Sequence, residues 1–305
     1  MRNYKIIKNS KIWLSLSTIL VTLSVIALFL WGLKPGLDFT GGSLLEVKFA
    51  GAQPTVVEIN EVFAQTDFGN LVIQPTGSNT IILRFQETSL EKHDQAITAL
   101  ESLEQAEAGL TEIRFESIGS SVGAELRSRA FWLVFFALLI IIIYITFAFR
   151  AVSKPVPSWK YGLISIVSLA HNILLTCGVF AVLGHFLGTE VNTTFIVALL
   201  TVLGYSINDT IVVFDRVREN LPKSHLSFAE TVNDSLNQTF VRSVNATATT
   251  VLALLSILIF GGGSIKDFVL ALVIGIFCGA YSSLFLAAPL LVLTEKRQRR
   301  HRQKN

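Results

Sequence analysis

Six long apolar segments restrict the folds that this sequence can adopt. They span roughly residues 12–32, 130–149, 161–184, 191–214, 243–262 and 268–293. A run of about 20 apolar residues can cross the hydrocarbon core of a bilayer as one helix. Only 15% of the residues are charged, against about 25% in an average soluble domain. The sequence therefore predicts a polytopic α-helical membrane protein with six transmembrane helices.

Basic residues precede the first segment, which raises the alternative of a cleaved signal peptide. The apolar run 12–32 is longer than is typical of signal peptides, and no Ala-x-Ala site follows it. We therefore expect residues 1–32 to form a short N-terminus and a retained first helix. Cys177 and Cys278 both lie in apolar segments, where we interpret them as packing residues rather than a disulfide.

The distribution of Lys and Arg predicts the orientation, because short loops rich in basic residues stay on the cytoplasmic side. Basic residues gather before the first helix, in the loops 150–160 and 215–241, and in the tail 294–305. The two short loops on the other side contain a single Lys or Arg between them, Lys266. Both termini are therefore expected in the cytoplasm.

The segment 33–129 is the one large region between predicted helices, and the orientation puts it in the periplasm. Between Gly32 and Ser128 the chain holds 14 acidic and 6 basic residues. Alternating apolar residues indicate strands, and helical spacing indicates helices, in the order βαββαβ. These elements cover 43–49, 55–66, 71–74, 80–85, 89–104 and 111–118, with a turn at 75–79. This order predicts a ferredoxin-like α+β domain.

Residues 130–293 are expected to form the remaining helices of the bundle, with a cytoplasmic amphipathic segment at 215–241. Four apolar residues of this segment fall on one helical stripe: Phe228, Val232, Leu236 and Phe240. A short helix in the membrane interface explains such a stripe. A docking surface for a cytoplasmic partner is the alternative.

Asp209 is the residue that most directly indicates function, since it is a carboxylate inside the apolar run 191–214. A charge at that depth costs roughly 3 kcal/mol or more. Such residues are usually retained because they pair, titrate or conduct ions. An unpaired carboxylate in hydrocarbon takes up a proton, because desolvation disfavours its charged form. The sequence offers Arg242, at the start of the fifth predicted helix, as the charge partner.

Other polar groups lie at a similar depth. His171 and Asn172 fall midway along the third predicted helix, and Asn245 follows Arg242 on the fifth. Polar side chains of this kind can simply hydrogen-bond neighbouring helices together, at about 0.6 kcal/mol each. His171 could instead relay protons, and Arg242 could extend to the interface. Both interpretations stay open at this point.

Other chemistries find no support in the sequence. No Walker A run and no Cys/His metal spacing is present, so we expect no nucleotide, no metal and no cofactor other than protons. His93, His225 and His301 are flanked by polar residues and are expected at the surface. The basic tail is interpreted as an anchor to anionic lipid rather than a nucleic-acid site.

Four motifs together resemble the SecD/SecF family of protein-export membrane proteins. They are GLDFTGG at 36–42, VGAEL at 122–126, GYSINDTIVVFDRVREN at 204–220 and LNQTFVRSVN at 236–245. The resemblance extends over about 1–295 and is to the smaller subunit. It implies that the six helices are half of a resistance-nodulation-division bundle and pair with six helices of SecD. It also implies that the protein is not an enzyme.

The family resemblance also implies residue roles and partners. Asp209 matches the titrating carboxylate and Arg242 the functional arginine, while Asn208 and Asn245 lie in the same motifs. The expected partners are SecD, the SecYEG channel, SecA, a YajC-like subunit and an unfolded polypeptide in transit. The expected location is the plasma membrane, or also a thylakoid if the organism is photosynthetic. A proton-coupled exporter of small molecules or lipids is the rival class, and a passive scaffold of the translocon is a third interpretation.

Overall fold

The computed structural model describes most of the chain between Tyr4 and Lys304. The residues outside the description are 1–3, 65, 67, 69–70, 77–78, 87, 104–108, 149–155, 262–264 and 305. Part of the predicted turn at 75–79, together with Arg150 and Lys154 of the predicted basic loop, therefore lies outside the described residues. The chain divides into two compact units, one made of Met1–Lys34 and Trp132–Asn305 and the other of Pro35–Phe131.

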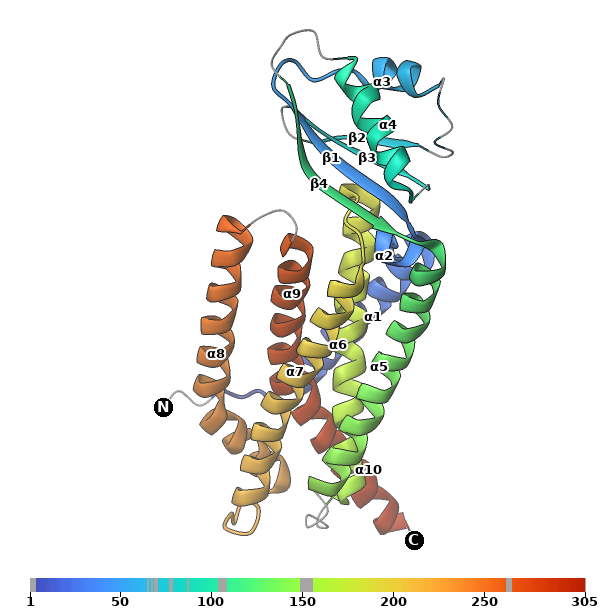
Figure 1. Ribbon diagram of the computed structural model, residues 1–305. Helices are drawn as coiled ribbons and strands as arrows, with labels where there is room; N and C mark the ends of the chain where they lie inside the picture. Colours follow the sequence, from blue (N-terminus) through green and yellow to red (C-terminus); the bar gives the residue numbers. More distant parts are fainter. Residues whose placement is uncertain are drawn as a thin grey trace. The chain divides into compact units, whose positions relative to one another are not determined.

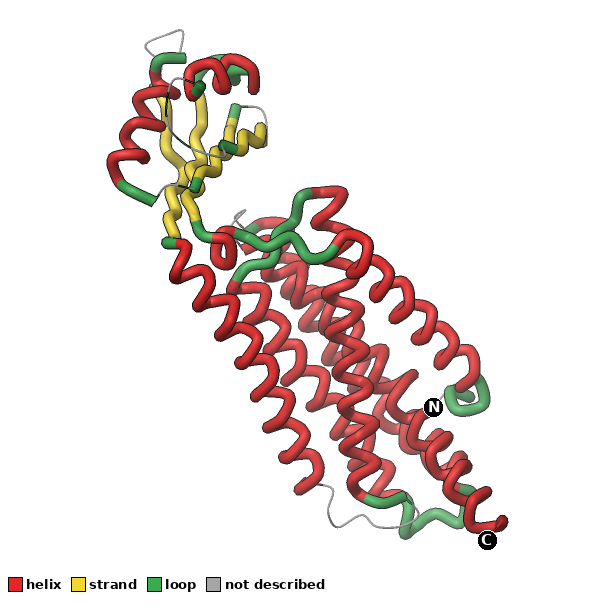
Figure 2. The backbone as a smooth tube through the Cα atoms, turned by 90° about the vertical axis from the view of Figure 1, so that its right-hand side faces the viewer, coloured by secondary structure: helices red, strands yellow, loops and turns green. Residues whose placement is uncertain are grey.

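The larger unit is a bundle of long helices joined by loops at their ends (Figure 2). Its elements are α1 (Ser10–Trp31), α5 (Ser120–Ala148, whose first residues belong to the smaller unit), α6 (Ser158–Leu187), α7 (Thr193–Asn220), α8 (Phe228–Phe260), α9 (Lys266–Ser282), η2 (Ser283–Ala287) and α10 (Ala288–Lys304). Within the described residues, six helical stretches are long and apolar enough to span a membrane, the last running from α9 into α10. The predicted six transmembrane helices are confirmed.

The smaller unit is the predicted α+β domain. It contains a short helix α2 (Leu37–Thr40), β1 (Gly42–Phe49), α3 (Val56–Phe63), β2 (Val72–Thr76), β3 (Thr80–Phe85), α4 (Leu90–Glu101) and β4 (Leu110–Ile118). The antiparallel sheet has the order β2-β3-β1-β4. Helices α3 and α4 cover one face of it (Figure 1). The βαββαβ order is confirmed.

The core of this domain follows from the alternation in its strands. Leu45 and Val47 of β1 and Leu83 of β3 are fully buried, and they pack with Ile59 of α3 and Leu100 of α4. Strand residues two apart point to the same face, so one face collects the apolar side chains. Helix α3 begins at a capping box, in which the side chains of Thr55 and Glu58 each accept a hydrogen bond from the other's backbone N–H.

Two glycines of the GLDFTGG motif are required by the backbone. Gly41 and Gly42 have φ angles of 71° and 112°, which strain any residue with a Cβ. A Cβ on Gly41 would lie 2.8 Å from the Cα of Ser120, and one on Gly42 would lie 2.7 Å from the carbonyl oxygen of Phe85. Gly123 of the VGAEL motif also lies close to Gly41. Two motifs that are far apart in the sequence therefore meet.

Helices α7 and α9 run side by side in parallel and approach closely. A Cβ on Gly275 would overlap the side chain of Val202, and one on Gly279 would lie 3.0 Å from the Cβ of Ser206. One turn further, Ser283 hydrogen-bonds Thr210 at 2.8 Å. The contacts repeat every four residues on both helices, which is the spacing of one helical face. We call this set of three contacts the small-residue ladder.

The amphipathic stretch at 215–241 is not a separate interfacial helix, so that interpretation is wrong. Its first part completes α7, and its second part opens the continuous 33-residue helix α8. No Gly or Pro interrupts α8, and a capping box of Ser227 and Glu230 starts it. Val232 and Leu236 of the apolar stripe are fully buried in the core of the bundle. The stripe therefore serves internal packing.

Candidate functional site

Asp209 lies in the middle of α7 and is held from the neighbouring helix α8. The hydroxyl of Ser243 donates a hydrogen bond to Oδ1 of Asp209 at 2.5 Å. Ser243 itself is 1% exposed. The second carboxylate oxygen, Oδ2, is buried and has no hydrogen-bond partner within the described part of the chain. One oxygen is thus fixed by a donor, and the other is available to a proton.

Arg242 does not reach Asp209. No ion pair within 4 Å joins the two residues in the part of the chain that the structure describes. Arg242 is exposed on α8, and its charge acts on Asp209 across a longer distance. Direct pairing of the two therefore stays a prediction for another conformation.

A chain of buried polar side chains approaches Asp209 from α6. Nδ1 of His171 lies 3.2 Å from Oδ1 of Asn172, whose amide donates to the hydroxyl of Ser206 at 2.6 Å. The carbonyl of Ser206 in turn accepts hydrogen bonds from Thr210 and Ser283. The structure thus joins His171 to α7 through Asn172 and Ser206 rather than by a direct contact with Asp209.

The exposed faces of α7 and α8 carry polar groups at membrane depth. Two such residues lie on α7, with the exposed Gly204 between them, and three lie on α8: Thr201, Asn208, Arg242, Asn245 and Thr249. Their spacing of three or four residues puts each set on one helical face. Only 6% of the residues in the apolar 18-residue stretch of α8 are buried, whereas 56% of those in the corresponding stretch of α6 are buried. Asn208 and Asn245 therefore lie on the surface of the isolated chain and not against Asp209.

Sequence reasoning missed Ser243, whose hydroxyl bonds the carboxylate, and Ser283, whose hydroxyl lies near it. Ser283 begins the π-helical turn η2, and such turns are frequent at functional sites. Ser243 directly follows Arg242 in the fourth motif, and this proximity was the only signal that could have indicated it. No run of residues in the sequence indicated the π-helical turn.

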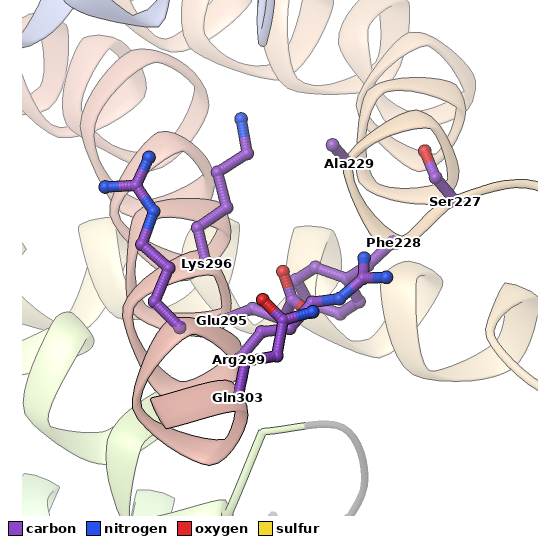
Figure 3. Close-up of a pocket in the computed structure, with 8 residues that line it drawn as sticks. Ser227, Phe228, Ala229, Glu295, Lys296, Arg299 and Gln303 are labelled. Carbon is purple, nitrogen blue, oxygen red and sulfur yellow. The ribbon is translucent and has the colours of Figure 1, made fainter. Parts of the chain in front are cut away.

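A second surface of interest is a basic groove at the start of α8. The groove has a volume of about 620 Å³ and is lined by Ser227, Phe228, Ala229, Glu295, Lys296, Arg299, Arg300 and Gln303. Side chains of α10 face the first turn of α8 across it (Figure 3). Its basic side chains suit an anionic group, and contact of the tail with anionic lipid stays a prediction. Among the described residues no group of three or more His, Cys, Asp or Glu side chains could hold a metal ion.

Known proteins share both the sequence and the architecture. Residues 98–297 match the family described as protein export membrane protein SecD/SecF, C-terminal, and residues 26–52 match the SecD/SecF GG motif. The protein translocase subunit SecF of Thermobaculum terrenum is 41% identical over 295 residues, covering 92% of this chain and 91% of the relative. The SecF subunit of a Synechocystis species is 35% identical over 289 residues, covering 90% of this chain and 89% of the relative.

A solved structure supports the same assignment. The crystal structure of SecDF, a translocon-associated membrane protein from Thermus thermophilus, matches with a TM-score of 0.82 and 30% identity. The match covers 97% of this chain but 39% of the SecDF chain. A super-membrane-facing form of SecDF matches with a TM-score of 0.70. The chain is therefore a multi-pass membrane protein that belongs to the SecD/SecF family of protein-export membrane proteins, as a SecF-type translocase subunit.

Proposed function

We propose that this subunit pairs with SecD and uses proton flow through Asp209 to promote late steps of protein export. The observation that carries the proposal is the exposed polar face of α7 and α8 beside Asp209, a half-buried carboxylate whose Oδ2 is buried. Lipid cannot satisfy polar groups such as Asn208, Arg242 and Asn245 at membrane depth. A second membrane protein is therefore needed to cover this face, and the solved SecDF chain supplies such a half in one polypeptide.

The proposal assigns each residue a role. Asp209 is the proton-binding group, and Arg242 is the cation that stabilises its charged form or pairs with it in another state. Asn208 and Asn245 line the face toward SecD. His171 delivers or receives protons through the hydrogen-bonded chain that ends at Ser206. The small α+β domain transmits the resulting helix movement to the polypeptide in transit.

The proposed setting follows from charge distribution and family. Both termini lie in the cytoplasm, the α+β domain lies in the periplasm, and the protein resides in the plasma membrane, with a thylakoid as a further site in a photosynthetic cell. The complex works beside SecYEG, SecA and a YajC-like subunit. The basic tail contacts anionic lipid on the cytoplasmic surface, where each Lys or Arg contributes about 1 kcal/mol.

Replacement of Asp209 tests the proposal. In membrane vesicles that contain the complete complex, Asp209→Asn is expected to abolish the part of export that depends on the proton motive force. Asp215→Asn is the matched control, because Asp215 lies on the same helix but is exposed and within 3.8 Å of Arg218. Undiminished export in Asp209→Asn would rule out the proton-coupled role and favour a passive scaffold.

Isolation of the complex separates this function from the rival exporter. A small-molecule exporter of this fold type carries two large outer domains in one chain, whereas this chain contains one. Purification in mild detergent is expected to recover a SecD-like subunit with the chain. Recovery of a homodimer that moves small molecules would support the exporter instead.

A further inference from the structure

The hydroxyl of Ser243 behaves differently from other hydroxyls on the same helix. Six of those donate to the backbone carbonyl four residues earlier: Thr231, Ser235, Thr239, Thr249, Thr250 and Ser256. Back-bonding of this kind is the usual arrangement for Ser and Thr within a helix. Ser243 instead reaches across to α7 and donates to Asp209.

The burial of Ser243 and the charge of Asp209 explain why the bond to Asp209 is favoured over back-bonding. Ser243 is buried, and a hydrogen bond to a charged carboxylate is about twice as strong as one between neutral groups. Burial of the site strengthens the bond further, because the local dielectric constant is low. The carbonyl of Thr239, four residues before Ser243, is the acceptor that back-bonding would use.

We propose that Ser243 is a positioning residue that ties α8 to α7 when Asp209 is charged and releases this tie when Asp209 is protonated. The inference rests on the proposed proton-coupled function. The proton adds to Oδ2 of Asp209, which is buried and has no hydrogen-bond partner in the described chain, and Ser243 keeps its own hydrogen. The neutral carboxylic acid is a weaker acceptor, so the hydroxyl then turns back to the carbonyl of Thr239.

Other charged and polar groups also lie around Asp209. Arg242 contributes a positive charge from α8, and Ser283 contributes a hydroxyl from η2. The hydroxyl of Ser283 is held by Thr210 at 2.8 Å, and on α7 the hydroxyl of Tyr205 lies 3.5 Å from Thr250 on α8. On α6, His171 is joined through Asn172 to Ser206 and makes no hydrogen bond with Asp209 among the described residues. Ser243 is thus the donor that directly joins α8 to the carboxylate.

The consequence is a link between protonation and helix packing. While the bond exists, the middle of α8 is attached to the middle of α7 at membrane depth. Loss of the bond removes this mid-membrane attachment of α8 to α7, while only 6% of the residues in the apolar stretch of α8 are buried within this chain. A proton can therefore change how α8 sits against its neighbours without breaking any covalent bond.

The test compares titration of Asp209 in Ser243 variants of the purified SecD-containing complex. The infrared band of the protonated carboxyl, assigned by its loss in Asp209→Asn, is followed against pH. Ser243→Ala removes one oxygen from a buried site and is expected to move the midpoint about one unit higher, a tenfold change in proton affinity. Ser243→Thr keeps a hydroxyl and is expected to restore the wild-type midpoint.

Ser165→Ala is the matched control, because Ser165 is equally buried and its hydroxyl bonds the carbonyl of Tyr161 on its own helix. An unchanged midpoint in Ser243→Ala, or an equal shift in Ser165→Ala, would overturn the inference. If Asp209→Asn abolishes export while Ser243→Ala titrates like the wild type, only this inference fails. If Asp209→Asn exports normally while Ser243→Ala shifts the midpoint, the proposed function fails instead.

Discussion

Replacing Gly275 by Ala tests the close contact between α7 and α9. The new Cβ would overlap the side chain of Val202, with Cγ1 at 2.8 Å and Cβ at 3.1 Å. Carbon atoms prefer separations of about 3.5–4.0 Å, so α9 must move away by roughly 1 Å. Valine has one preferred rotamer in a helix and cannot simply turn aside.

The expected magnitude is the difference of two effects. Overpacking a well-packed contact costs about 1–3 kcal/mol. Replacing Gly by Ala in a helix interior contributes about 1 kcal/mol in the opposite direction. We therefore expect Gly275→Ala to destabilise the bundle by about 1 kcal/mol, which lowers the unfolding midpoint by about 2–4 °C in a chain of this size.

Thermal unfolding in mild detergent, followed by tryptophan fluorescence, measures this change. Gly204→Ala is the matched control, because nothing lies within 4 Å of a Cβ at Gly204, and it should unfold at the wild-type temperature or above. Val202→Ala is expected to cost less in the Gly275→Ala background than alone, since it removes the overlapping methyl groups. If Gly275→Ala is as stable as the wild type, the small-residue ladder is not as tight as described.

Two further predictions concern the α+β domain. His93 lies 2.9 Å from both Asp94 and Glu112; burial opposes its protonation, but the hydrogen bonds and charges of the two carboxylates outweigh burial and raise the pKa of His93 above 6.5. The stability from this cluster is therefore complete below about pH 6.5, as long as the two carboxylates stay charged above about pH 4. It is lost as the pH rises through the raised value, so wild type and His93→Gln should differ most in thermal stability between about pH 5 and 6.5. A difference that stays constant with pH would contradict this assignment. Gly41→Ala should weaken hydrogen-exchange protection of β1 by at least about 1–2 kcal/mol because of its positive φ, whereas Gly51→Ala, at an open position, should leave the protection unchanged.

The behaviour of His93 differs from what its sequence neighbours indicated. Polar flanking residues predicted a surface histidine, and this prediction holds for the exposed His225 and His301. His93 instead packs against Phe115 of β4 and bonds Glu112 of the same strand. The contact joins residues that are 19 and 22 positions apart along the chain, and local composition carries no information about such pairs.

The sequence alone determined the features that depend on local physics. Span length follows from bilayer thickness, so the six helices could be counted directly. Strand alternation and helical spacing predicted the βαββαβ order, because one face of each element must be buried. The cost of a charge in hydrocarbon singled out Asp209 before any neighbour was known.

Only the tertiary structure decided which groups surround Asp209. In an apolar helix most faces are hydrophobic, so the sequence does not show which face meets another helix or which hydroxyl turns toward a carboxylate. The donor proved to be Ser243 rather than Arg242, because the packing of α8 against α7 turns Ser243 inward and leaves Arg242 exposed. The continuity of α8, the π-helical turn at Ser283 and the small-residue ladder likewise depend on contacts between distant segments. Local pattern fixes which segments cross the membrane, and helix packing fixes what the carboxylate touches.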